Sequence, residues 1–195
     1  MNRRLTERGL ERRRQLVAFA AQRFADNGYH PTSVADIVNG MGVGKGVFYW
    51  YFASKEELFA EILREAQHEL RRRQELAFGD ETDPMVRIEL GIRATMAWLS
   101  ENRHYFLLFQ FASTEERFRQ LLRKGEEVAV ADVVRHVRAA IAAGEVRDSD
   151  PLVLTHAILG VTNHLARTLL YERGDDPNDV AEAAMAFCLG GLRTV

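Results

Sequence analysis

Residues 33–52, SVADIVNGMGVGKGVFYWYF, decide the fold. Asp36 stands three positions after Ser33, which is the spacing of a capping box at the start of a helix. Gly40-Met41-Gly42 then interrupts the helical pattern. A second short helix is expected from about Gly44 to Phe52. We therefore predict two short helices joined by a glycine-containing turn, which is the arrangement of a helix-turn-helix.

The second of these helices has two chemically different faces. Its apolar side chains can pack inward on the preceding helices: Val43, Val47, Phe48 and Phe52. Polar and aromatic side chains then point outward, as binding in a major groove requires: Lys45, Tyr49 and Tyr51. Gly44 and Gly46 allow close approach of a sugar-phosphate backbone, and Lys55 at the next helix start can meet a phosphate. Trp50 packs between helices or touches the DNA backbone, and Tyr49 has the alternative reading of a plain surface aromatic.

Outward from this stretch, the chain reads as one helix after another, without strand-like alternation. Further helices are expected over residues 6–26, 54–76, 84–100, 104–111, 114–143, 151–173 and 177–189. The prediction is an all-α fold of about nine helices in two domains. Residues 1–58 form a helix-turn-helix DNA-binding domain with a basic N-terminal extension, and residues 59–195 form a helical ligand-binding and dimerisation domain.

Charge and composition narrow the function classes. The 195-residue chain carries a net charge of −2, which divides into +3 for residues 1–60 and −5 for the remaining residues. The N-terminal 60 residues are therefore the part expected to bind a polyanion. The single Cys188 excludes an intrachain disulfide and fits a reducing cytoplasm. No apolar run predicts a signal segment or a membrane span. No catalytic or metal-ligand pattern is present, so we expect no enzyme, no metal and no cofactor.

Three segments together resemble one known family. They are GYHPTSVADIV at 28–38, GVGKGVFYWYF at 42–52 and SKEEL at 54–58, within a match from about Leu16 to Ile62. This region resembles the TetR family of bacterial regulators. The resemblance implies an all-helical, Ω-shaped homodimer that binds double-stranded operator DNA. Gly44 and Tyr51 depart from the family, where a small polar residue and a histidine are usual, so no operator sequence is carried over.

By the same resemblance, individual positions take expected roles. Thr32, Ser33 and Val34 start the supporting helix, where the family contacts the DNA backbone. Lys45 and Gly46 stand where it reads bases, and Tyr49 and Lys55 stand where it grips phosphates. Arginines at 3, 4, 8, 12, 13 and 14 either reach DNA as a basic arm or form a solvated tail.

The C-terminal two-thirds is expected to sense a ligand and to dimerise. The last two helices carry apolar and small residues, and the TetR-family resemblance implies a two-fold four-helix dimer interface there, with intrachain core as the alternative reading. A small, largely apolar effector is expected at an aromatic-rich site with polar handles: Trp98, Tyr105, Phe106, Phe109, Gln110, His156, Asn163, His164 and Arg167. An aromatic stripe is more often ordinary core.

The function predicted is a ligand-responsive repressor that releases operator DNA when the effector binds. The alternatives are an activator, a nonspecific architectural DNA protein, or an all-helical enzyme or ligand carrier.

Overall fold

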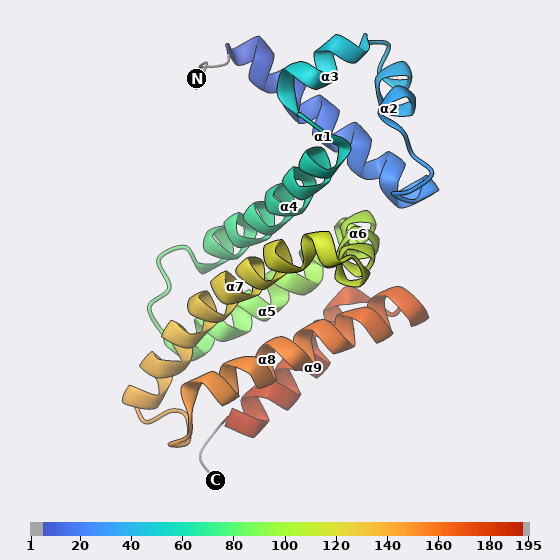
Figure 1. The fold of residues 1–195 in the computed structure, drawn as a ribbon. Helices are drawn as coiled ribbons and strands as arrows, with labels where there is room; N and C mark the ends of the chain where they lie inside the picture. The colour runs from blue at the N-terminus through green and yellow to red at the C-terminus, as the bar shows by residue number, and fades with distance from the viewer. Residues whose placement is uncertain (1–5, 193–195) are drawn as a thin grey trace. The chain divides into compact units, whose positions relative to one another are not determined.

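The computed structural model describes residues 6–192, and the part it describes is helical throughout and contains no β-strand. This confirms the all-α prediction. In chain order the elements are α1 (Glu7–Asn27), α2 (Val34–Gly40), α3 (Lys45–Tyr51), α4 (Lys55–Phe78), α5 (Pro84–Glu101), α6 (Arg103–Thr114), α7 (Glu116–Ala142), α8 (Pro151–Leu165), the π-helix η1 (Ala166–Arg173) and α9 (Pro177–Leu192) (Figure 1).

The helices divide between two compact units. The first contains the chain up to Ala66 together with His104–Leu121, and the second contains Gln67–Arg103 and the chain from Leu122 onward. Helices α4 and α7 each contribute residues to both units. The domain boundary expected between residues 58 and 59 falls inside α4 and stays a prediction.

The first unit is built on α1 and closed by aromatic side chains. Thr6 caps α1 by accepting a hydrogen bond from the Gly9 amide, and Gly28 ends it with a φ of 85°, a conformation that glycine adopts without strain. Large side chains from α1, α3 and α4, and from the residue that follows α3, fill the core: Leu16, Phe24, Phe48, Phe52 and Phe59. Helices α1, α2 and α3 pack together at this core (Figure 1).

The second unit packs α5 and α8 against α9. Apolar side chains of α5 and α9 make much of its interior, including Ile92, Met96, Ala184 and Met185. No helix within residues 6–192 combines the length and the apolar character that crossing a membrane demands.

One element differs from the prediction. A single helix was expected over 151–173, but the α-helical hydrogen bonding gives way to a π-helix at Ala166. Two hydrogen bonds tie this segment to α5 and α6: Tyr171 Oη donates to the Leu99 carbonyl, and Arg103 Nη2 donates to the Tyr171 carbonyl, each at 2.9 Å. A π-helix shifts backbone bonding by one residue and leaves the apolar pattern nearly unchanged, so periodicity did not reveal it.

Candidate nucleic-acid interface

The start of α2 is fixed by a reciprocal capping box. The Asp36 amide donates to Ser33 Oγ at 3.1 Å, while the Ser33 amide donates to Asp36 Oδ2 at 2.8 Å. The Ser33 hydroxyl also donates to that carboxylate at 2.6 Å. These bonds from the Ser33 hydroxyl and backbone lower the pKa of Asp36. The capping box predicted from the sequence is confirmed, and it leaves Ser33 exposed and Val34 half-buried at the beginning of the helix.

The turn between α2 and α3 depends on Gly42. Its φ of 65° lies in the left-handed region, which glycine occupies without a steric penalty. The Gly42 amide donates to the Asn39 carbonyl at 3.1 Å, and the Val43 amide donates to the Val38 carbonyl at 2.9 Å. The chain therefore reverses within a few residues and begins α3 at Lys45, as the sequence predicts.

The inner face of α3 is anchored by two phenylalanines. Phe48 and Phe52 are fully buried, with ring centroids 6.1 Å apart, and the Arg13 guanidinium lies 5.1 Å from the Phe52 ring. Arg13 is itself held by Glu61 at 2.5 Å and Glu65 at 3.1 Å on α4. The orientation of α3 is thus set by its packing against neighbouring helices.

The outer face of α3 carries the predicted DNA-contact side chains into solvent. Lys45 is exposed, and Tyr49 and Trp50 keep 57% and 58% of their surface accessible. Tyr51 is half-buried. A Cβ added to Gly44 or Gly46 would meet open space, so the fold itself does not require glycine at either position.

Lys55 and Thr32 are turned toward the protein. Lys55 Nζ donates to the carbonyls of Tyr29 and Thr32, both at 3.0 Å, and lies 4.4 Å from the Tyr29 ring centroid. The Thr32 hydroxyl is buried and donates to the Gly28 carbonyl at 2.8 Å. Both residues hold the turn between α1 and α2 in place.

The arginines predicted as an N-terminal extension are mostly helical. Arg8, Arg12, Arg13 and Arg14 belong to α1, because Thr6 starts that helix. Arg3 and Arg4 lie outside the described residues. Arg13 is engaged with α4 as described above, so it supports the scaffold.

An aromatic cluster that the sequence analysis did not single out lies behind the interface. The Tyr29 ring stacks on Phe111 of α6 at 5.0 Å and packs edge-on against Phe59 of α4 at 4.8 Å and Phe118 of α7 at 5.9 Å. Burial and the nearby Glu56 carboxylate raise the pKa of Tyr29. The sequence signal was the tyrosine directly after Gly28, but its partners are distant along the chain.

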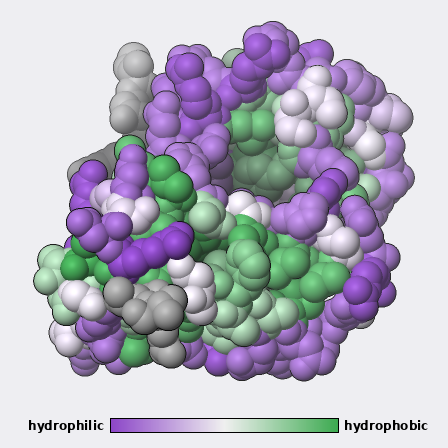
Figure 2. Space-filling view, turned by 90° about the horizontal axis from the view of Figure 1, so that it is seen from below, coloured by the Kyte–Doolittle hydropathy of each residue, from purple (hydrophilic) through white to green (hydrophobic). Residues whose placement is uncertain are grey.

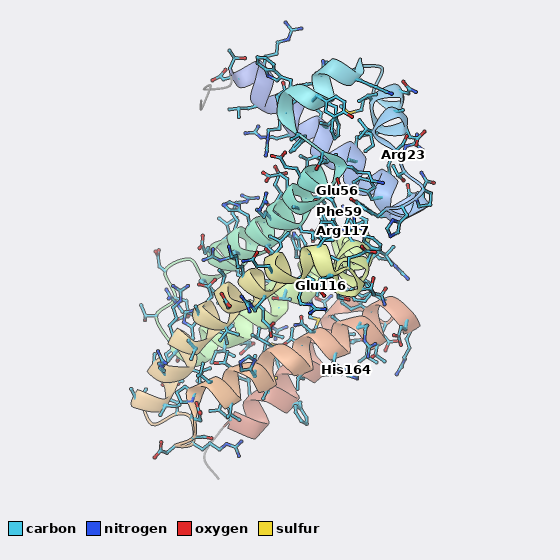
Figure 3. The ribbon with its side chains drawn as sticks, in the orientation of Figure 1. Arg23, Glu56, Phe59, Glu116, Arg117 and His164 are labelled. Carbon is cyan, nitrogen blue, oxygen red and sulfur yellow. The ribbon has the colours of Figure 1, made fainter. Side chains whose placement is uncertain are left out.

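Ion pairs surround this aromatic cluster. Arg117 Nη1 lies 3.4 Å from Glu56 Oε1, and His30 Nε2 lies 3.0 Å from Glu115 Oε1 (Figure 3 labels Glu56, Phe59 and Arg117). The first contact joins the first turns of α4 and α7, and the second joins the turn that precedes α2 to Glu115, between α6 and α7.

The residues predicted to bind an effector are divided between the two compact units, and their role stays a prediction. Tyr105, Phe106, Phe109 and Gln110 belong to the first unit, whereas Trp98 and the four α8–η1 residues belong to the second. Trp98 is buried, and Tyr105, Phe106 and Phe109 are half-buried. The remaining members are exposed: Gln110, His156, Asn163, His164 and Arg167 (His164 is labelled in Figure 3).

Two short helices joined by a tight turn, with a buried inner face and an exposed lysine and aromatics, define a helix-turn-helix DNA-binding protein. Comparison with known proteins agrees. Residues 16–62 match the family described as "Bacterial regulatory proteins, tetR family". Over 192 residues the chain is 25% identical to the uncharacterized HTH-type transcriptional regulator YdgC of Bacillus subtilis, covering 96% of each chain.

Two named regulators are also similar. The transcriptional repressor KstR2 of Mycobacterium tuberculosis is 47% identical over 53 residues, 27% of this chain and 26% of that one. Its structure, described as a ketosteroid transcriptional regulator, gives a TM-score of 0.73 at 26% identity and covers 94% of this chain and 96% of that one. The activator FasR of Mycolicibacterium smegmatis is 32% identical over 101 residues, 51% of this chain and 46% of that one. Residues 16–62 therefore match the DNA-binding region of the TetR family, and the chain is a DNA-binding transcriptional regulator whose fold is similar to that of KstR2.

Proposed function

We propose that this protein is a cytoplasmic repressor that binds double-stranded operator DNA as a homodimer and releases it when a small, largely apolar molecule binds. The observation that carries the proposal is the outer face of α3. Lys45, Tyr49 and Trp50 are exposed there, whereas Phe48 and Phe52 are buried. A helix anchored in this way can enter a major groove without rearrangement of the core.

The open surroundings of Gly44 and Gly46 support the same interface. Since a side chain at either position would meet no protein atom, the advantage of glycine lies outside the chain. A DNA backbone that approaches α3 closely supplies that reason. In this reading Lys45 and Gly46 face base edges, while Tyr49, Trp50 and Tyr51 contact the sugar-phosphate backbone.

The supporting helix contributes contacts of a different kind. Ser33 and Val34 mark the start of α2, where backbone amides of the first turn can meet a phosphate. Thr32 and Lys55 act through the turn that positions α2, because their polar atoms are bound to backbone carbonyls.

The homodimer is proposed to form through α8 and α9. Both helices expose large apolar side chains, namely Leu152, Val153 and Phe187. Small exposed residues lie between them, and a Cβ at Gly160, Gly190 or Gly191 would meet open space, which allows a second helix to pack closely. Figure 2 shows hydrophobic surface on the face of the molecule seen from below. By the TetR-family resemblance, the partner that covers this surface of α8 and α9 is a second copy of the chain.

Activation of transcription is the second candidate, because FasR, which is 32% identical over 101 residues, is described as an activator. The proposed DNA contacts are identical for both. A transcription assay on the bound promoter separates them, since a repressor lowers transcript output and an activator raises it.

The test of DNA binding uses fluorescence anisotropy with DNA from upstream of the coding gene. Lys45→Ala and Tyr49→Ala each weaken binding by at least about tenfold, as loss of a base or phosphate contact does. The matched control is Lys124→Ala, which removes an exposed lysine from α7. If either α3 variant bound the DNA with wild-type affinity, the assignment of α3 as the DNA-binding interface would be wrong. If the wild-type protein also bound this DNA no more tightly than random DNA, the result would favour the alternative functions of enzyme, ligand carrier or architectural DNA protein.

A further inference from the structure

A cavity in the second unit is lined by none of the residues predicted to bind an effector. It has a volume of about 490 Å³ and lies among the end of α4, the loop after it, the start of α5 and the C-terminal part of α7. Its lining residues are Glu75, Phe78, Gly79, Thr82, Pro84, Arg87, Arg135, His136 and Ala139. A cavity of this size is in the range of small-molecule sites.

His136 is the feature of this cavity that packing does not explain. Only 8% of the residue is exposed, and its Nε2 atom is buried without a hydrogen-bond partner among the described residues. Its ring packs edge-on against Phe78 at 5.4 Å. Buried polar atoms are nearly always partnered in folded proteins. A ligand group in the cavity would supply the missing partner.

Burial, and then the charges of Arg135 and Arg87, lower the pKa of His136. The imidazole is therefore neutral near pH 7, and in one tautomer its Nε2 donates a hydrogen bond. The ring can satisfy an acceptor on a ligand without adding a buried charge.

Two arginines make the wall of the cavity cationic. Arg135 has only a loose ion pair with Asp132, at 3.7 Å, because that carboxylate is held more closely by Arg71 at 2.7 Å. Arg87 donates from Nε to the Glu81 carbonyl at 2.6 Å, and its guanidinium lies 5.7 Å from the Phe78 ring. Each guanidinium group therefore has N–H donors that can bind an anion in forked geometry. Glu75 is the one acidic side chain in the lining and offsets part of this charge.

We propose that this cavity binds a small organic carboxylate whose apolar body packs on Phe78 and Pro84 and whose oxygens meet Arg135, Arg87 and His136. The proposal that this carboxylate is the effector rests on the repressor function proposed above. The proposal that the cavity binds a carboxylate does not. The mixed lining excludes a purely apolar ligand, since such a ligand would leave His136 Nε2 unpaired.

The experiment is isothermal titration calorimetry of the full-length protein with sodium phenylacetate, sodium octanoate and the uncharged analogue phenylacetamide. Both carboxylates bind with a Kd of about 1 mM or tighter, and phenylacetamide binds at least about tenfold more weakly. Arg135→Gln and His136→Gln each weaken phenylacetate binding by about tenfold or more. Arg138→Gln, an exposed arginine of α7 outside the lining, leaves it unchanged.

Three results would overturn the proposal: no binding of either carboxylate, equal binding of the amide, or unchanged binding in Arg135→Gln. Arg135 is exposed, so its variant folds even if His136→Gln does not. The same preparations are assayed for operator binding by anisotropy. Protein that binds phenylacetate through Arg135 but binds no operator retains the carboxylate site and refutes the repressor function. Protein that binds operator but neither carboxylate retains the function and refutes the site.

Discussion

Two lysines of the first unit have opposite surroundings. Lys45 extends into solvent from the first turn of α3. Lys55 is half-buried, with Nζ bound to two backbone carbonyls and placed against the Tyr29 ring. Residue type and motif position predict a DNA contact for both. The contacts of Lys55 also hold the turn between α1 and α2, and its DNA contact stays a prediction.

The two lysines therefore separate stability from DNA binding. Lys55→Met is expected to lower the free energy of unfolding by about 2 kcal/mol, because it removes charge-assisted hydrogen bonds to carbonyls that stay partly buried. Lys45→Met is expected to change it by less than about 0.5 kcal/mol and to lose operator affinity. Urea unfolding and DNA anisotropy measure the two quantities. Equal unfolding midpoints for the two variants would contradict the role of Lys55 as a clamp.

At the scale of the element, α2 is a short helix whose start is set by Ser33 and Asp36. Short helices are marginal on their own, so a cap that satisfies amides at both Ser33 and Asp36 weighs heavily in their formation. The same box holds the Ser33 end of α2 where a phosphate is proposed to lie.

The capping box makes the stability of α2 dependent on pH. The pKa of Asp36 is lower in the folded state, so the contribution of this carboxylate is complete above about pH 4, the ordinary range of aspartate. It is lost as the pH falls through the folded-state value. Asp36→Asn should therefore destabilise the protein at pH 7, and the difference from wild type should shrink as the pH falls below 4.

Urea unfolding across that pH range measures the difference. Asp80→Asn, at an exposed position after α4, serves as the control and should track wild type. A difference for Asp36→Asn that stays constant with pH would show that the carboxylate charge does not matter to the cap.

Helix α6 contributes to the same unit through one aromatic face. Phe111 stacks on Tyr29 and lies 5.6 Å from Phe59 and 5.4 Å from the His30 ring. Phe111→Ala is expected to cost about 3 kcal/mol of unfolding free energy, from lost burial and lost ring contacts. Leu107→Ala, on the exposed side of α6, should cost less than about 1 kcal/mol.

Chemical denaturation of both α6 variants provides the measurement. Similar losses at the two positions would mean that α6 is stabilised by its apolar content in general and not by the Tyr29 cluster.

At the scale of the whole molecule, the exposed apolar residues of α8 and α9 form the proposed dimer interface. Phe187 keeps 69% of its surface accessible in the single chain. An isolated exposed phenylalanine is unremarkable, but here Leu152, Val153 and a series of small residues accompany it on the same pair of helices.

Phe187→Glu is expected to convert the dimer to a monomer, because two charges would be buried near the two-fold axis without partners. Operator affinity should fall with it, since two half-sites can no longer be bound together. Light scattering after size-exclusion chromatography measures the mass. Leu76→Glu places the same charge at an exposed leucine of α4 and should remain dimeric. A dimeric Phe187→Glu protein would place the interface elsewhere.

Much of the fold was predictable because its signals are local. The capping box at Ser33, the left-handed Gly28 and Gly42, and the 3.6-residue periodicity of the long helices all act within about one helical turn. Helix bounds accordingly agree within a few residues, except where the π-helix begins at Ala166. The outward set on α3 followed from the same periodicity once Phe48 and Phe52 were placed inside.

The amino-acid sequence by itself determined the helices, the turn and the two faces of α3, because neighbouring residues settle backbone conformation. Tertiary packing alone decided that Lys55 faces Tyr29, that Tyr29 meets Phe111, and that His136 lines a cavity beside Arg87 and Arg135. Those partners lie far apart along the chain, and contacts between distant segments depend on how whole helices pack rather than on any local pattern.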